Sequence, residues 1–314
     1  MKKWMEIVGI VALVIFNMTT AWAQQDPMYS MYMFNGLSVN PAYAGSRDRL
    51  AITALYRHQW TGLDGAPKTA VLVGHAPTFN DKLGIGFTLV SDNIGVFNTV
   101  TLMSSYAYRI RIGKTGRLAL GLSVELNYFH ARWNTLALSD ETDYVFQSGK
   151  TNVFSPNFGG GIYYYSDRFY AGFSVPHFLN SSLTEHFKLE GTNLVARQWK
   201  HYFFTAGAMF RIGENVQFKP SVLFKYVKNA PFQADLNVAF LFKEAFWIGA
   251  GYRTKDAVVL MTEYNFAKGV RIGYAYDITL SELNDYSSGT HEIMLGFELT
   301  KKDTYLSPRR MSYF

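Results

Sequence analysis

The chain contains no cysteine, and only 17% of its 314 residues are charged. The lack of cysteine excludes disulfide bonds, catalysis by a thiolate and metal sites with cysteine ligands. Soluble proteins usually carry about 25% charged residues, so part of this surface is expected to face something other than water. No stretch after residue 23 approaches the roughly 18 apolar residues of a membrane-spanning helix, which excludes an α-helical membrane protein.

The chain is basic, with a net charge of +6 and a pI near 9.2, yet its Lys and Arg residues are scattered singly. A nucleic-acid interface needs basic residues gathered on one face, so we expect no nucleic-acid partner. Aromatic residues reach 17%, and 26 glycines stand against 9 prolines. Together with the low charge, this composition indicates that something other than water covers part of the surface.

The first 23 residues are typical of an export signal. Lys2 and Lys3 form a basic start, Ile7 to Phe16 is an apolar run, and Ala21 and Ala23 suit the cleavage positions. We therefore expect residues 1–23 to be a signal peptide and the mature chain, with a charge of about +5, to begin at Gln24. Because no cysteine follows the apolar run, the signal is not that of a lipoprotein.

Apolar residues recur with period two through most of the mature chain. In "RLALGLSVELNY", Leu118, Leu120, Leu122, Val124 and Leu126 alternate with small or polar residues. Segments of about ten residues with one apolar face are typical of transmembrane β-strands, and only a closed barrel leaves no backbone group unpaired in lipid. The sequence predicts an all-β protein, a transmembrane antiparallel β-barrel of about 14 strands. The expected strands are 50–60, 68–76, 82–91, 97–110, 116–130, 157–165, 168–176, 201–212, 215–227, 231–242, 245–253, 256–266, 269–279 and 289–300.

The connections between these strands alternate between tight and long. Long ones are expected at 131–156, 177–200 and 280–288. Short periplasmic turns and longer extracellular loops are usual, which places both chain termini in the periplasm of a diderm bacterium. The predicted divisions are the signal peptide 1–23, an N-terminal periplasmic or plug segment 24–49, the outer-membrane barrel 50–300 and a periplasmic tail 301–314. A large soluble β-sandwich or an open barrel, whose strands also alternate, is the alternative fold.

The expected inward face of the barrel carries charges of both signs. They are Glu125, Arg211, Lys219, Lys225, Asp235, Glu263, Arg271, Asp277, Glu292 and Glu298. Mixed signs on neighbouring strands favour internal ion pairs over a lumen selective for one type of ion. A diffusion channel stays open as a second function, because wall side chains alone do not fill so wide a barrel.

The segment "QDPMYSMYMFNGLSVNPAYAG" (25–45) precedes the first strand and is crowded with Met, Tyr and Phe. Such a segment either folds into the lumen or docks onto a periplasmic partner. The triplet "GGG" at 159–161 lies in a strand pattern, where a bend or a close approach of two backbones is favoured over a phosphate loop.

The chain also resembles a known family. "DPMYSMYMFNGLSVNPAYAGS" (26–46) followed by "YRHQWTGLDGAPKT" (56–69) is similar to the opening of the PorP/SprF outer-membrane proteins of type IX secretion and gliding motility. The likeness continues through "SDNIG" (91–95), "GIYYYSDRFYAGFSVPH" (161–177), "KPSVLFKY" (219–226), "GAGYR" (249–253), "YAYDITLSEL" (274–283) and "GTHEIMLGFEL" (289–299).

The resemblance implies a non-enzymatic component that supports export or surface anchoring of cargo proteins such as adhesins. Its implied partners are outer-membrane lipid, the periplasmic ring and motor lipoproteins, and a large surface adhesin bound through its C-terminal sorting domain. Candidate partner-binding residues are Asp26, Pro27, Tyr29, Tyr32, Phe34, Asn35, Asn40, Pro41, Tyr43, Gly45, Tyr56, Arg57 and Trp60. The loops at 131–156 and 177–200 are expected to face cargo.

Enzyme, cofactor and metal interpretations find little support in the residues. The seven histidines lie in no recognisable nucleophile motif, and His291 and Glu292 are neighbours on a strand, so their side chains point to opposite faces. His177 and His186 form a weak metal candidate, for which an ordinary solvated loop is the favoured interpretation. We expect no catalytic site, no cofactor and no metal.

Overall fold

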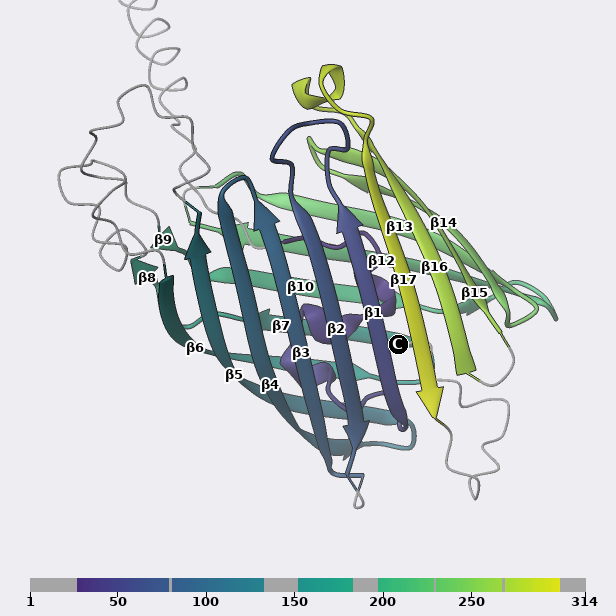
Figure 1. Ribbon diagram of the computed structural model, residues 1–314. Coiled ribbons are helices and arrows are strands. Elements are labelled where there is room, and N and C mark those ends of the chain that lie inside the picture. The colour runs from purple at the N-terminus through teal and green to yellow at the C-terminus, as the bar shows by residue number, and fades with distance from the viewer. Residues whose placement is uncertain are drawn as a thin grey trace, which may run out of the picture.

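A computed structural model describes residues 27–78, 81–132, 152–182, 197–228, 230–266 and 269–299. Their strands form one antiparallel sheet closed into a barrel, because β10 pairs with both β7 and β12 (Figure 1). β10 and β11 are two parts of one wall strand, so the barrel has 14 strands, as predicted. The described residues contain no helix long and apolar enough to cross a membrane.

The wall strands follow one another around the barrel in chain order. They are β1 (Leu50–His58), β2 (Lys68–Pro77), β3 (Leu83–Ile94), β4 (Phe97–Ile112), β5 (Gly116–Ala131), β6 (Asn152–Tyr165), β7 (Phe169–Val175), β10 (His201–Ala208) with β11 (Phe210–Arg211), β12 (Val216–Val227), β13 (Gln233–Phe242), β14 (Phe246–Arg253), β15 (Ala257–Asn265), β16 (Val270–Thr279) and β17 (Thr290–Leu299). A small hairpin of β8 (Ser181–Ser182) and β9 (Arg197–Gln198) stands apart.

The alternating pattern places its two faces as expected. In β5, Leu120 and Leu122 are exposed on the outer, lipid-suited face, whereas Ser123 and Glu125 are buried in the lumen. Eight of the ten predicted luminal charges are buried, and Glu298 is largely buried. Arg211 differs, because it is exposed at the end of the short β11.

Two prolines explain where the strands depart from the prediction. β6 begins at Asn152, five residues before the predicted start, and passes through Pro156. The Phe158 carbonyl oxygen accepts a hydrogen bond from Phe178 N–H, so the backbone groups of Phe158 point away from β5. Backbone groups two residues apart in a strand point the same way, so those of Pro156 also point away from β5. The missing N–H of Pro156 therefore removes no hydrogen bond to β5. Pro220 in β12 likewise lies where the pairing with β10 and β11 is interrupted.

The two ends of the barrel differ in their connections. At one end, called the turn end, the connections 78–82, 113–115, 166–168, 212–215, 243–245 and 266–269 have three to five residues each. The other, the loop end, carries the long connections 59–67, 132–151, 176–200 and 280–289, the last with the 3-10 helix η6 (Glu282–Asp285). The predicted asymmetry of connection length is confirmed.

Residues 28–49 lie inside the barrel and are called the luminal strap (Figure 1, purple). The strap contains three 3-10 helices, η1 (Tyr32–Phe34), η2 (Gly36–Ser38) and η3 (Pro41–Tyr43). Pro41 occupies the first position of η3, and Asn40 caps it by accepting a hydrogen bond from Ala42 N–H. Single 3-10 turns follow the lumen more closely than a long helix would.

The strap enters at the loop end and leaves at the turn end. Ser30 contacts Asp277 and Glu292, which lie at the loop ends of β16 and β17, whereas Arg47 contacts Glu298 near the turn end of β17. β17 itself ends at the turn end. The two ends of the described chain, Pro27 and Leu299, therefore lie at opposite ends of the barrel. The termini themselves lie outside the described residues, so the expectation that both are periplasmic stays a prediction.

Candidate functional site

The strap occupies the lumen of this barrel. Polar or ring contacts and close approaches join the strap to β1 through β7 and to β12, β13, β14, β16 and β17. Met31, Leu37, Ala42 and Ala44 are fully or almost fully buried by these contacts. The strap is therefore the core of the barrel.

An ion-pair network holds the strap at the loop end. Arg57 bridges two carboxylates, with its Nη2 2.8 Å from Asp277 Oδ2 and its Nη1 3.0 Å from Glu292 Oε2. Glu292 in turn accepts hydrogen bonds from the backbone N–H of Ser30 at 2.9 Å and of Met31 at 2.7 Å. A buried carboxylate with two amide donors and a guanidinium is well compensated for its loss of water.

The same network extends to the neighbouring strands. Arg253, fully buried, lies 3.0 Å from Asp235 and 3.3 Å from Asp277. Ser30 Oγ donates to Asp277 Oδ1 at 2.7 Å. Several wall strands and the strap thus share one set of charges, as the predicted internal ion pairs require.

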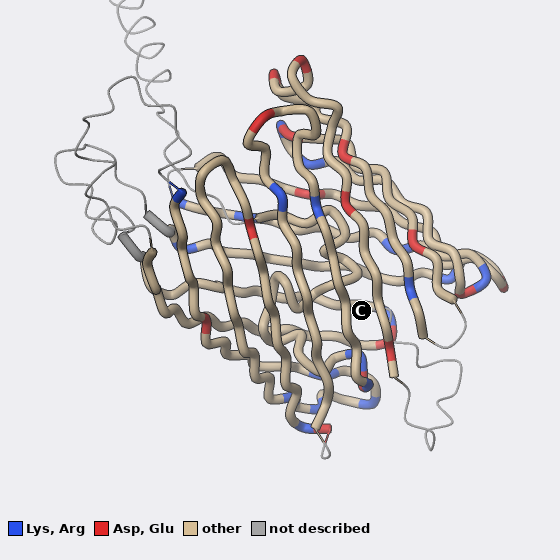
Figure 2. Tube along the Cα trace, viewed as in Figure 1, with Lys and Arg blue, Asp and Glu red and all other residues tan. Residues whose placement is uncertain are grey.

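A second network holds the strap at the turn end. Arg47 pairs with Glu298, which also lies 3.3 Å from Arg49. Arg109 donates to the carbonyl oxygen of Gly45 and lies 3.0 Å from Asp48. Figure 2 shows these charges gathered near the two ends of the barrel, with most of the wall between them uncharged.

Between the two networks the strap packs through aromatic and amide groups. The ring centroids of Phe34 and Trp247 are 5.5 Å apart, edge to face. Lys219 Nζ donates to the Met33 carbonyl oxygen at 3.2 Å and lies 5.7 Å from the Phe34 ring centroid. The Tyr32 hydroxyl, also buried, accepts a hydrogen bond from Asn237 Nδ2 at 2.9 Å.

Glycines on the wall make room for the strap. A Cβ added to Gly121 would overlap the Ala42 backbone, and one added to Gly84 would overlap the Ala44 carbonyl group. Gly161, in the predicted "GGG" site, lies against the Asn40 side chain, which donates to the Ile162 carbonyl oxygen at 3.0 Å. The close backbone approach expected at 159–161 is confirmed.

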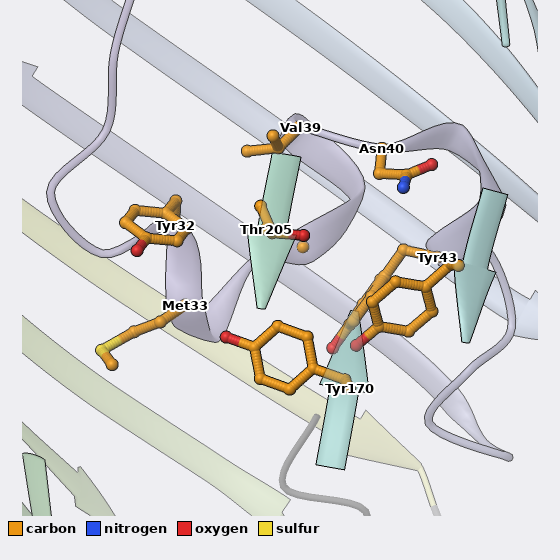
Figure 3. Close-up of a pocket in the computed structure, with 9 residues that line it drawn as sticks. Tyr32, Met33, Val39, Asn40, Tyr43, Tyr170 and Thr205 are labelled. Carbon is orange, nitrogen blue, oxygen red and sulfur yellow. The ribbon is translucent and has the colours of Figure 1, made fainter. Parts of the chain in front are cut away.

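One small cavity separates the strap from the wall (Figure 3). Its volume is ≈ 20 Å³, and it is lined by Tyr32, Met33, Gly36, Val39, Asn40, Tyr43, Tyr163, Tyr170 and Thr205. This is room for about one water molecule, whereas ligand pockets usually measure roughly 300 to 1,000 Å³. The cavity is a packing space and is too small for a substrate.

The predicted partner-binding residues fall into two groups. Those of the strap, Tyr29, Tyr32, Phe34, Asn35, Asn40, Pro41, Tyr43 and Gly45, are buried in the lumen; Pro27 is half-buried, and Asp26 lies outside the described residues. Tyr56 is exposed on the outer face, and Arg57 points into the lumen. Trp60 follows β1, and its backbone N–H donates to Thr290 Oγ1. A docking role for the strap residues would require the strap to leave the lumen.

The histidines show two outcomes. The Glu292 side chain is buried on the luminal side, whereas His291 Nδ1 lies 2.7 Å from the hydroxyl of the exposed Tyr274. The side chains of His291 and Glu292 therefore point to opposite faces of the wall, as predicted. The expectation that His177 belongs to a solvated loop is wrong: it is buried, with Nδ1 3.2 Å from Glu125 Oε2. Its proposed metal partner His186 lies outside the described residues, and those described contain no group of three side chains suited to a metal ion.

Sequence reasoning missed four residues that hold the strap, namely Ser30, Met31, His75 and Arg109. It predicted Lys219 as a luminal charge but missed its hydrogen bond to the strap. One available signal was glycine at inward-facing positions of several strands. Glycine weakens a strand unless another backbone comes close, so repeated inward glycines indicate a filled lumen.

Comparison with known proteins places the chain in a family. A profile described as "Type IX secretion system membrane protein PorP/SprF" matches residues 21–297, nearly the whole sequence. This closed β-barrel is an outer-membrane protein, and the chain belongs to the PorP/SprF family of type IX secretion. No curated protein matches the sequence.

Solved structures resemble the chain in fold. The CymD monoaromatic hydrocarbon channel has a TM-score of 0.50 at 10% identity, with 85% of this chain and 93% of that chain covered. A Pseudomonas aeruginosa FadL homologue has a TM-score of 0.46 at 12% identity, covering 90% and 96%. A TodX deltaS2S3 mutant channel has a TM-score of 0.45 at 11% identity, covering 83% and 92%. At such identities the likeness concerns the fold alone.

Proposed function

We propose that this protein is a closed, non-enzymatic outer-membrane component of a type IX secretion and gliding machinery. It supports the export or surface anchoring of cargo proteins such as adhesins by docking partners at its two ends. Membership of the PorP/SprF family supports the assignment to type IX secretion. The observation that supports docking over transport is the strap, which crosses the lumen and contacts strands around almost the whole wall.

The two ends suit different partners. The turn end exposes Lys114, Arg168 and Lys243 on its short connections, and with short turns in the periplasm it faces the ring and motor lipoproteins. The loop end would face a large adhesin and its sorting domain. Tyr56 and Trp60 remain candidates at the loop-end rim, and the strap residues act by keeping the barrel closed.

Pull-down of the tagged barrel from native membranes in mild detergent, with mass spectrometry, tests the docking. The double variant Lys114→Glu and Arg168→Glu should lose the periplasmic lipoproteins, because it replaces two exposed basic side chains of the turn end with acidic ones. Lys255→Glu is the matched control, since Lys255 is equally exposed but lies at the loop end. It should keep these partners.

Planar-bilayer recordings test the alternative, a porin-like channel. The wild-type barrel should show no steady conductance, and a variant lacking residues 28–44 should conduct if it still inserts. Steady conductance by the wild type, together with no partner recovered from any variant, would replace the proposal with the channel.

A further inference from the structure

The path of the strap gives information about the membrane side of the amino end. A plug that starts and ends in the periplasm would enter and leave the lumen at the same end. Here Ser30 and Met31 are bound by Glu292 at the loop end, and Gly45 donates to His75 Nδ1 near the turn end of β2. The strap therefore passes through the barrel from one end to the other.

Burial and hydrogen bonds at the loop end show that the strap enters the lumen there. Pro27 and Met28 are half-buried, whereas Tyr29 to Phe34 are buried, so burial increases from Pro27 inward. Arg57 also donates to Ser30 Oγ at 2.8 Å, which places the Ser30 hydroxyl between Arg57 and Asp277. Pro27, the first described residue, thus lies at the loop end.

The partners of Ser30 lie on the last two strands of the chain, 247 and 262 residues away. Those strands complete the barrel, since β17 pairs with β1. The wall glycines Gly84 and Gly121 leave no slack around the strap. A finished barrel has no spare room through which the chain's end and the large side chains of the strap could pass, so the strap must lie on the sheet before β1 and β17 join.

We infer that the strap is enclosed as the barrel closes, and that its described start at Pro27 opens onto the loop side of the membrane, opposite the end of β17. With long loops on the cell surface, this end belongs to the cargo-facing surface and not to the periplasmic one. The inference rests on the course of the strap, so it holds whichever partner the loop end binds.

Single cysteines test this directly, because the natural chain has none. Three variants are compared: Pro27→Cys, Asp285→Cys at the loop end and Lys114→Cys at the turn end, both of the latter exposed. A membrane-impermeant maleimide carrying a polyethylene glycol chain is added to intact cells and to cells with a permeabilised outer membrane. A fourth variant carries one cysteine on a Gly/Ser spacer inserted before Asp26, which removes any effect of the half-buried position of Pro27.

The expected result is that both amino-terminal cysteines react under the same condition as Asp285→Cys. Reaction under the condition that labels Lys114→Cys, and not Asp285→Cys, would overturn the inference. If the barrel were inserted the other way round, Asp285→Cys and Lys114→Cys would each react under the condition expected for the other. The amino-terminal cysteines would still be compared with the control at their own end of the barrel. The pull-down result is independent of this pattern, so failure of the proposed function is recognised separately.

Discussion

Gly121 in β5 lies directly against Ala42 of the strap, so close that a Cβ on Gly121 would overlap the Ala42 nitrogen. The neighbouring atoms belong to backbone on both sides, which cannot turn away as a flexible side chain can. The wall and the strap are therefore fitted to each other.

Gly121→Ala should destabilise the barrel by about 1 to 3 kcal/mol, the usual cost of overpacking a core. The measurement is the urea midpoint of the purified barrel in micelles, read by the shift between folded and unfolded bands on a gel. Gly74→Ala is the control, because a Cβ at Gly74 meets nothing within 4 Å. Equal midpoints for both variants would contradict a strap seated on the wall.

Glu292→Gln should release the loop-end part of the strap. The substitution removes the charge that faces Arg57 and places an amide N–H₂ against the backbone N–H of either Ser30 or Met31, which loses its acceptor. Breaking a buried ion pair on one side costs about 3 to 5 kcal/mol. The variant should unfold at lower urea and show bursts of conductance in bilayers, while Glu282→Gln, exposed at the same end, should change neither.

The wall of this barrel was predictable from the sequence, because lipid on the outside enforces a strict alternation. Leu118 to Leu126 show it without interruption, and the 14 strands follow from repeating that pattern. The start of β6 was not predictable from the sequence, because a proline within a run argues against a strand. Only the structure shows that the nitrogen of Pro156 points away from β5, where no hydrogen bond to that strand is lost.

The strap was predictable only as a choice between filling the lumen and docking outside. Its composition of Met, Tyr and Phe suits both, and its contacts lie up to 262 residues away in the chain. Its direction depends on Glu292 accepting hydrogen bonds from the backbone N–H groups of Ser30 and Met31 and on Arg57 donating to the Ser30 hydroxyl. Neither periodicity nor composition records such contacts. The burial of His177 was missed for the same reason, because its partner Glu125 lies on another strand.

Phe34→Ala should show how much of the stability depends on the strap's aromatic packing. Phe34 is 4% exposed and lies edge to face on Trp247, so its removal leaves a cavity at the centre of the lumen. Truncating such a residue costs about 3 to 5 kcal/mol. Thermal unfolding followed by circular dichroism measures this loss. Phe154→Ala, at a site that is 74% exposed, should cost much less, and similar losses at both sites would contradict a packed strap.

Asp48→Asn tests the charge at the turn end without changing the backbone. Asp48 has a φ of 54°, a conformation that asparagine also adopts readily, so the substitution removes chiefly the negative charge beside Arg109 and Arg117. Arg109 is 3% exposed, and a guanidinium buried without its counter-ion is costly, so we expect a loss of about 1 to 3 kcal/mol in urea unfolding. Asp81→Asn is a close control, because Asp81 has a φ of 52° but is exposed on a turn at the same end. If the two variants unfolded at the same urea concentration, the charge of Asp48 would not contribute to holding the strap, and the turn-end contacts would rest on Arg47, Glu298 and the bond from Arg109 to Gly45.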